Sequence, residues 1–286
     1  MGKRILVTGG AGFVGSAIIK RLLVDGHDVE SLDNYDSGLL ENEHDGCKYH
    51  RADIESISLF GDDYDLCIHL AALSRIQPSF SNPTETYRVN TTGTQTVCEW
   101  ARTTKTAVIY AGSSSRWHNP LRSPYALAKH MGEEICKMYR KVYGLDVDII
   151  RFYNVYGPGE IVDGDWSAVI GKWRRQVRDG EKITIIGDGE QKRDFTHIDD
   201  IVDGIIKISN TTNHTDAWEL GTGANYSINE VYFAFREKFN IDAVYLPDQP
   251  GNYRCTMREN DDALEALNWK PKNKLIKYIK GLKHED

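Results

Sequence analysis

The sequence lacks the features that mark membrane, secreted and nucleic-acid-binding proteins. Its 286 residues contain no apolar run close to the roughly 20 that a membrane-spanning helix needs, and no apolar signal-peptide core precedes the first strand-like segment. The five cysteines are scattered and odd in number, which argues against a disulfide framework. With 35 basic against 42 acidic residues, the net charge of −7 disfavours binding to nucleic acid or an anionic membrane. These absences predict a cytoplasmic globular protein with neither kind of partner.

Strand-like and helical patterns alternate through the first half of the chain. The predicted strands are Ile5–Val7, Val29–Leu32, Tyr49–Ile54, Leu66–Leu70, Ala107–Ala111 and Val147–Phe152, and the predicted helices are Ala17–Val24, Thr91–Arg102 and Pro124–Tyr143. Such alternation is typical of right-handed crossovers between parallel strands. We therefore predict an α/β protein with a doubly wound parallel sheet.

The pattern becomes less regular beyond Gly157. Segments rich in Gly, Asp and Asn interrupt shorter elements there, and four of the six tryptophans fall in this part. At about 150 residues per domain, the length predicts two folding units. We expect a first domain of residues 1–156, to which residues 194–216 return, and a smaller, partly interleaved C-terminal lobe of residues 157–193 and 217–286.

A glycine-rich turn joins the first predicted strand to the first predicted helix. Gly9, Gly10, Gly12 and Gly15 satisfy both G-x-G-x-x-G and G-x-x-G-x-x-G. Glycines let a pyrophosphate approach the backbone closely, and the free N–H groups of the following helix then bind the anion. In the order strand, turn, helix, this motif predicts a Rossmann-type dinucleotide site.

An acidic residue at the end of the second strand selects the dinucleotide. Asp33 lies eighteen residues after Gly15, where a carboxylate accepts hydrogen bonds from ribose hydroxyls and repels a 2′-phosphate. The next residue is Asn34, with no arginine beside it. The sequence therefore favours NAD over NADP.

Tyr125 and Lys129 have the i, i+4 spacing that places two side chains on one helix face. Ser123 suits the N-cap and Pro124 the first helical position, so Tyr125 is expected in the first turn. The helix dipole and a lysine charge would lower the tyrosine pKa, which suits a base that takes a proton from a sugar hydroxyl. A hydroxyl cluster that begins at Ser113 ends an apolar strand, at the sheet edge where ligands bind in such folds.

With these motifs, the chain resembles an extended short-chain dehydrogenase/reductase of the NAD-dependent sugar-nucleotide epimerase/dehydratase family, closest in appearance to UDP-galactose (UDP-glucose) 4-epimerases. The resemblance runs nearly end to end. Its landmarks are Thr8–Gly15, Leu32–Gly38, Arg51–Ile54, His69–Ala72, Val89–Asn90, Tyr125–Lys129, Arg151–Gly159, Gly187–Asp200 and Leu267–Lys272.

The resemblance implies an NAD site in the first domain and a smaller lobe that contributes to substrate binding. The residues implied to bind the cofactor are Gly9, Gly12, Phe13, Val14, Gly15, Asp33, Asn34, Ser37, Asp53, Ile54, Leu70, Ala71, Ala72, Asn90, Tyr125, Lys129 and Phe152. The residues implied to bind the substrate are Ser74, Ser113, Tyr125, Asn154 and Arg193. Among these, Asn154 and Arg193 are expected to meet a nucleotide diphosphate, with UDP-sugars favoured.

The implied reaction is C4 epimerisation through a transient 4-keto sugar. In it Tyr125 acts as base, Lys129 tunes that base, and Ser113 binds the reacting oxygen. Family dehydratases and decarboxylases carry acids just after the position of Ser113, where this chain has Ser114 and Ser115, and serine is a poor proton carrier. A 4,6-dehydratase, decarboxylase or reductase is the alternative, and a catalytically silent NAD-binding sensor is a third.

Two departures put substrate contacts in doubt. Tyr125 follows Ser113 by only twelve positions, and Arg116-Trp117-His118 replaces the family's Val-Tyr-Gly. Where the family has a second phosphate-binding arginine before Gly-Asp, this chain reads Gln249-Pro250-Gly251-Asn252, for which Arg254 or Arg258 could compensate. The identity of the sugar stays open.

Three further patterns are interpreted as structural features outside the predicted active site. The spacing of His44, Cys47 and His50 lacks a fourth ligand, so we expect no metal site. The basic residues from Lys172 to Arg178 are interpreted as a solvated helix face. An apolar stripe of Leu127, Met131, Met138 and Val142 lies away from Lys129 and predicts a homodimer contact.

Overall fold

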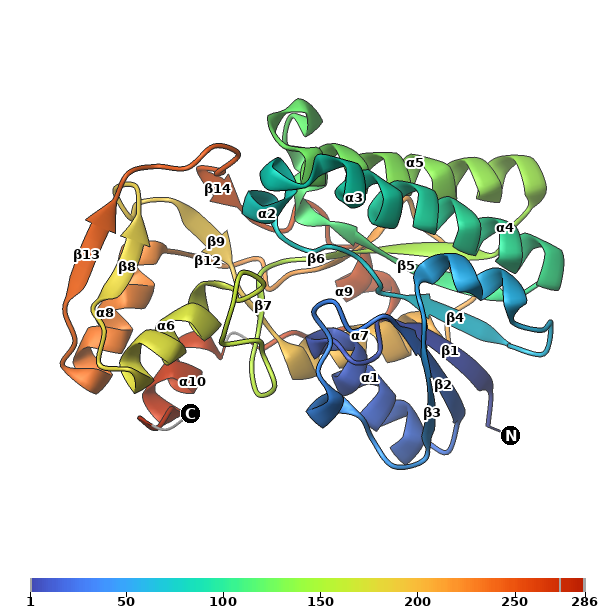
Figure 1. The fold of residues 1–286 in the computed structure, drawn as a ribbon, viewed down its shortest axis with the longest axis horizontal. Helices are drawn as coiled ribbons and strands as arrows, with labels where there is room; N and C mark the ends of the chain where they lie inside the picture. The colour runs from blue at the N-terminus through green and yellow to red at the C-terminus, as the bar shows by residue number, and fades with distance from the viewer. Residues whose placement is uncertain (1, 273, 285–286) are drawn as a thin grey trace. The chain divides into compact units, whose positions relative to one another are not determined.

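The computed structural model describes residues 2–272 and 274–284, and these form two compact units (Figure 1). The first unit contains the residues up to Arg151 together with Val202–Trp218. The second contains Phe152–Ile201 and the residues from Glu219 onward.

A seven-stranded sheet organises the first unit, in the order β11-β6-β5-β4-β1-β2-β3. Its strands are β1 Arg4–Thr8, β2 Asp28–Asp33, β3 Cys47–Arg51, β4 Leu66–His69, β5 Ala107–Ser113, β6 Val147–Phe152 and β11 Trp218–Leu220. The pairings of β1 with β2 and β4, of β2 with β3, and of β4 with β5 are parallel. The chain order reverses between β1 and β4, which is the ligand-binding switch point of a doubly wound sheet. The predicted fold class is confirmed.

Helices cover both faces of this sheet. The helix α1 lies on one face, and α4 and α5 lie on the other (Figure 1). The helices of this unit are α1 Phe13–Val24, α2 Ile76–Ser81, α3 Pro83–Tyr87, α4 Thr94–Thr104 and α5 Pro124–Tyr143, with a π-helical segment over Arg88–Gly93 before α4 and with α7 Ile198–Ile208 entering from the second unit. Side chains of β1, β4, β5, α4 and α5 form its core, among them Leu6, Cys67, Val108, Val97 and Cys136. None of the described helices is both long and apolar enough to cross a bilayer.

In the described residues, the second unit is built from short strands, four whole helices and the first turn of a fifth. Its strands form three small sheets, β10-β7, β12-β9-β14 and β13-β8. The elements are β7 Val155–Tyr156, α6 Val169–Arg178, β8 Ile183–Ile186, β9 Lys192–Asp194, β10 Thr196–His197, β12 Asn225–Ser227, α8 Ile228–Phe239, β13 Ala243–Leu246, β14 Cys255–Thr256, α9 Asp262–Ala266 and α10 Leu275–Gly281, in addition to the first turn of α7. Trp173 of α6 packs edge-on against Phe235 of α8 at the centre of its core, with ring centroids 5.4 Å apart.

The dividing points between the units lie a few residues from those expected. The chain was expected to leave the first domain after residue 156 and to return at 194, whereas the units divide after Arg151 and Ile201. The reason is local, because β7 and β10 pair with each other in parallel and so hold both segments in the second unit.

One predicted strand is misplaced. The segment Tyr49–Ile54 was expected to be extended, but β3 ends at Arg51 and a 3-10 helix begins at Ile54. The carboxylate of Asp53 caps that helix by accepting a hydrogen bond from the Ile54 N–H at 2.7 Å, and this bond ends the strand.

Candidate active site

The glycine-rich turn follows β1 at the switch point and leads into α1. Gly9 has a positive φ of 75°, and a Cβ there would lie 2.8 Å from the Ala71 nitrogen. A Cβ at Gly15 would lie 2.1 Å from the Gly9 carbonyl oxygen, so both positions require glycine. Gly12 is the N-cap of α1, and the helix begins without a capping side chain or an acidic residue in its first turn. The first amides of α1, from Phe13 to Gly15, are therefore suited to a pyrophosphate.

Asp33 ends β2 beside this turn and is buried. Its Oδ2 accepts a hydrogen bond from the Ala11 N–H at 2.9 Å, and its Oδ1 accepts one from the Tyr35 N–H at 2.8 Å. Burial raises the pKa of Asp33, and these two backbone bonds act against that rise. Each oxygen keeps a second lone pair, so the carboxylate can still receive a ribose diol. The predicted Asn34 and Ser37 lie in the turn after β2, where Asn34 Oδ1 accepts from the Asp36 N–H at 3.0 Å.

Residues after β3 and β4 form the next part of the predicted cofactor site. Asp53 is bound by Arg88 at 2.8 Å, beside the buried Ile54. Leu70, Ala71 and Ala72 follow β4, and the Ala71 N–H donates to Thr8 Oγ1 at 3.2 Å. The amide of Asn90 holds the loop that follows, because it pairs with both the N–H and the carbonyl of Leu73, at 2.8 and 2.9 Å.

The catalytic residues predicted from the sequence gather at the carboxyl end of β5. Ser123 caps α5 by accepting from the Ala126 N–H at 3.1 Å, and Pro124 is the first helical residue, as predicted. Tyr125 therefore lies in the first turn, with its side chain beside Ser113 at the end of β5. Its backbone N–H donates to Ser79 Oγ of α2 at 3.2 Å. The structure thus brings Ser113 and Tyr125 into contact.

Lys129 lies one turn further along α5, with its ammonium directed at the backbone. Its Nζ donates to the Ala111 carbonyl at 2.9 Å, two residues before Ser113. Burial lowers the pKa of Lys129 from 10.5 to about 8, against the opposing effect of Glu133. The predicted lowering of the Tyr125 pKa is not seen, because burial raises the pKa of Tyr125. The groups that oppose this rise are the hydrogen bond from Ser113 and the positive charge of Arg75.

The predicted substrate residues of the second unit gather around β9. Asn154 donates through Nδ2 to the Asp194 carbonyl at 2.8 Å and to Thr256 Oγ1 at 3.3 Å. Arg193 donates to the carbonyl of Lys192 and, at 2.6 Å, to Asn252 Oδ1. Burial lowers the pKa of Arg193 to about 10. Within the described chain, neither of its hydrogen-bond partners is a carboxylate, although the charge of Asp248 also acts on it. A guanidinium suits an anion.

The remaining predicted residues have simple positions. Phe152 is the last residue of β6, and Ser74 is exposed in the loop after β4.

The two arginines considered as substitutes for a missing phosphate ligand have other partners. Arg254 pairs with Asp188 at 2.8 Å, and Arg258 pairs with Asp261 at 2.7 Å.

Sequence reasoning missed three charged residues of the first unit. Arg75 is the N-cap residue of α2, from which its charge acts on Tyr125. Arg116 forms an ion pair with Glu133 of α5. Glu133 follows Lys129 by four residues, and that spacing alone could have indicated it. No local pattern marks Arg75, and Arg116 was noted only as a departure from the family's sequence.

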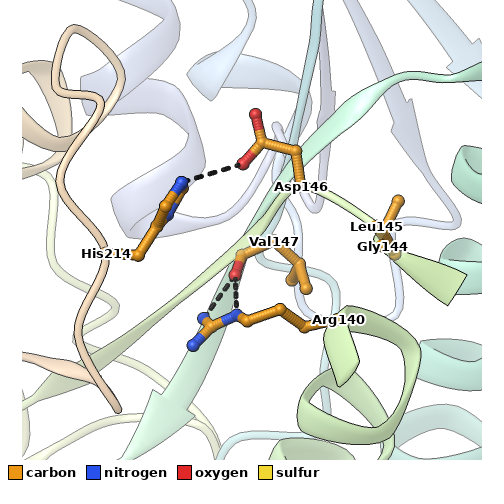
Figure 2. Close-up of a pocket in the computed structure, with 6 residues that line it drawn as sticks. All are labelled: Arg140, Gly144, Leu145, Asp146, Val147 and His214. Carbon is orange, nitrogen blue, oxygen red and sulfur yellow. Dashed lines mark hydrogen bonds and ion pairs between the residues drawn. The ribbon is translucent and has the colours of Figure 1, made fainter. Parts of the chain in front are cut away.

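A separate pocket of about 240 Å³ lies at the end of α5, outside the predicted site (Figure 2). Arg140 closes one side by donating to the Val147 carbonyl, and His214 faces Asp146 from the other side. His214 Nδ1 also lies 3.3 Å from Asp148 Oδ1, which accepts the Trp218 indole N–H at 3.1 Å. These contacts fasten the segment before β11 to β6, which is a structural role.

Comparison with known proteins identifies the family. The profile of the NAD dependent epimerase/dehydratase family matches residues 5–221. The chain belongs to this family. A UDP-glucose 4-epimerase of Mycolicibacterium smegmatis is 33% identical, with 96% of each chain covered. A UDP-N-acetyl-alpha-D-glucosaminuronate decarboxylase of Bacillus cytotoxicus is 29% identical over 81% of this chain and 78% of the relative.

The solved structures agree with the family assignment. The UDP-glucuronic acid 4-epimerase of Bacillus cereus, in complex with UDP-glucuronic acid and NAD, has a TM-score of 0.89 at 25% identity, over 97% of this chain and 96% of that one. The resemblance predicted from the motifs is confirmed, as is the expectation of an NAD-dependent enzyme. The uncapped start of α1 and the close-packed Gly9 and Gly15 fit that cofactor.

Proposed function

We propose that the protein is a nucleotide-sugar C4-epimerase with UDP-sugars as its favoured substrates. The observation that carries the proposal is that Tyr125 lies beside Ser113 at the carboxyl end of β5, one helical turn from Lys129. Ser114 and Ser115, which follow Ser113, carry no ionisable group. The site therefore has a base for a sugar hydroxyl and no acid at the positions where dehydration or decarboxylation would use one.

The side chains divide the proposed chemistry between them. Tyr125 takes the proton of the 4-hydroxyl, and Ser113 binds the same oxygen as it becomes a carbonyl. Lys129 orients the nicotinamide ribose and contributes a positive charge near that oxygen. Bound NAD supplies the hydride acceptor and donor at C4. Because the proton and the hydride both return, the reaction needs no external reductant.

The proposed NAD site consists of the residues named from the resemblance. The amides that begin α1 would hold the pyrophosphate, and Asp33 would hold the adenosine ribose. In the second unit, Asn154 and Arg193 would bind the nucleotide diphosphate. The support for this assignment is the charge of Arg193, which is partly desolvated and has no carboxylate among its hydrogen-bond partners in the described chain.

Proton NMR in D₂O tests the reaction. Purified protein would be incubated with UDP- and GDP-linked glucose, galactose, glucuronate, mannose and N-acetylhexosamine, without added reductant. Interconversion of C4 epimers with no solvent deuterium in the sugar is the expected result. It would show that the hydride returns directly, and it would also name the sugar.

The alternative is a dehydratase or decarboxylase with a proton donor elsewhere in the chain, which the decarboxylase relative favours. Deuterium at C5, loss of carbon dioxide or an accumulating 4-keto product in the same experiment would establish it. A silent NAD-binding sensor predicts that Tyr125→Phe leaves function intact, whereas either enzyme would lose most of its rate.

A homodimer through α5 is part of this proposal. The predicted stripe lies at the surface, since Met131 and Met138 are each 41% exposed and Val142 is 63% exposed. Such an apolar surface favours contact with a second copy over contact with water. Light scattering coupled to size-exclusion chromatography measures the mass, and a mass near 32 kDa at micromolar concentration would contradict the dimer.

A further inference from the structure

The connection between Ser113 and Tyr125 is short and has little regular structure of its own. It consists of two 3-10 turns, Ser114–Trp117 and Pro120–Arg122. Turns of this length have weak hydrogen-bond geometry and derive their stability from contacts with other elements. Ser113 caps the first turn, because its Oγ accepts a hydrogen bond from the Ser115 N–H at 3.2 Å. The position of the Ser113 hydroxyl is therefore linked to whatever fixes this turn.

Arg116 makes the polar contacts that join the first turn to α5. Its Nη1 lies 2.8 Å from His130 Nδ1, and its Nη2 lies 2.8 Å from Glu134 Oε1. Its Nε lies 3.7 Å from Glu133 Oε2. These partners occupy the helical turn that follows Lys129. A planar guanidinium reaches all of them from one position, which an ammonium does not.

Glu133 also contacts the backbone next to Ser113. A Cβ at Gly112 would lie 2.6 Å from Glu133 Oε1, so the carboxylate packs against the residue before Ser113. Arg151 donates to Glu133 Oε2 at 2.8 Å, and both side chains are 1% exposed. The Trp117 ring lies over the Arg151 guanidinium, 5.0 Å from its centre. Successive residues of the turn thus contact one buried ion pair.

We propose that Arg116 is a positioning residue: it fastens the turn that begins at Ser113 to α5 and so keeps Ser113 aligned with Tyr125. The inference rests on the proposed function for its kinetic consequences only. Loss of Arg116 leaves the Arg151–Glu133 pair intact, so the first unit is expected to stay folded.

The test compares Arg116→Gln with Arg116→Lys and with Arg21→Gln, using the NAD-bound protein. Arg21 is a matched control, because it pairs with Asp25 on α1 through an exposed ion pair. Hydrogen–deuterium exchange of residues 113–118 is expected to be about tenfold faster in Arg116→Gln and unchanged in Arg21→Gln. The kcat of Arg116→Gln is expected to fall about 10- to 100-fold while its KM stays within about threefold of the wild-type value, because misalignment of reacting groups affects the chemical step. Arg116→Lys should recover part of both losses.

The test of Arg116 can be distinguished from a failure of the proposed epimerase function. If the wild-type protein converts no nucleotide sugar, the epimerase proposal fails, and the exchange comparison still decides the role of Arg116. Unchanged exchange in Arg116→Gln, or a raised KM with an unaltered kcat, would overturn the inference. If Arg116→Gln does not fold, Glu134→Gln removes only the exposed partner of Arg116. Hydrogen–deuterium exchange of residues 113–118 must then be faster in Glu134→Gln than in the wild type. An exchange rate equal to that of the wild type would overturn the inference as well.

Discussion

Replacement of Lys129 by methionine should stabilise the protein while it removes activity. The lysine is buried, and its pKa is lowered from 10.5 to about 8, so folding works against its charge. At about 1.4 kcal/mol per pKa unit, this corresponds to about 3 kcal/mol at pH 7. Methionine removes that cost and loses the 2.9 Å hydrogen bond to the Ala111 carbonyl, which contributes about 1 kcal/mol. The expected net gain is about 2 kcal/mol.

The sign of the pH dependence follows from the lowered pKa. Between pH 8 and 10.5 the unfolded chain binds more protons at this residue than the folded chain does, so wild-type stability rises with pH in that window. The cost is fully present below pH 8 and disappears above 10.5. The advantage of Lys129→Met should therefore shrink from about 2 kcal/mol at pH 7 to near zero at pH 10.

Urea denaturation of nucleotide-free protein at both pH values measures this difference. Lys20→Met is the control, because Lys20 is exposed on α1 and its replacement should change little at either pH. If the proposed function is right, epimerase activity should fall at least about 100-fold in Lys129→Met. A Lys129→Met variant that is less stable than the wild type at pH 7, or one whose gain is the same at pH 10, would refute the reasoning.

Three further outcomes are expected. Arg75→Gln should move the rising limb of the kcat–pH profile to higher pH, since the charge of Arg75 lowers the pKa of Tyr125, and an unmoved limb would count against that role. Arg193→Leu should weaken UDP binding about 10- to 100-fold by calorimetry, and undiminished binding would remove Arg193 from the phosphate site. Gly112→Ala should cost about 1–3 kcal/mol in urea denaturation, because its Cβ would meet Glu133 at 2.6 Å; a variant as stable as the wild type would mean that the carboxylate moves freely.

The parts of the site that the sequence predicts correctly are local in the chain. The glycine turn, the N-cap at Ser123 and the spacing of Tyr125 and Lys129 each depend on neighbours within about five residues, and the structure shows all of them as expected. The strand pattern also predicts correctly that Asp33 lies at the end of β2, because that pattern too depends on residues close in the chain. Backbone geometry within one turn or one strand is set by short-range forces, so a pattern can reveal it.

The parts that the sequence did not predict depend on contacts between distant segments. Arg75 acts on a residue fifty positions later, and Arg116 meets its partners on α5 only because the chain folds back. The Tyr125 pKa was expected to fall because the sequence shows a lysine nearby, whereas burial and the direction of the Lys129 side chain decide the result. The misplaced end of β3 has a local cause instead, since the hydrogen bond between the neighbouring residues Asp53 and Ile54 competes with the strand.

The division of the chain has a consequence for how the protein can be made and recombined. The chain crosses between the units after Arg151, Ile201 and Trp218, and each crossing falls inside a regular element. A ribosome that has released residues 1–151 has not yet supplied β11, the edge strand of the first sheet. The first sheet can therefore be completed only after part of the second unit has been synthesised. Exchange of the second unit between relatives would therefore need three junctions instead of one contiguous insert.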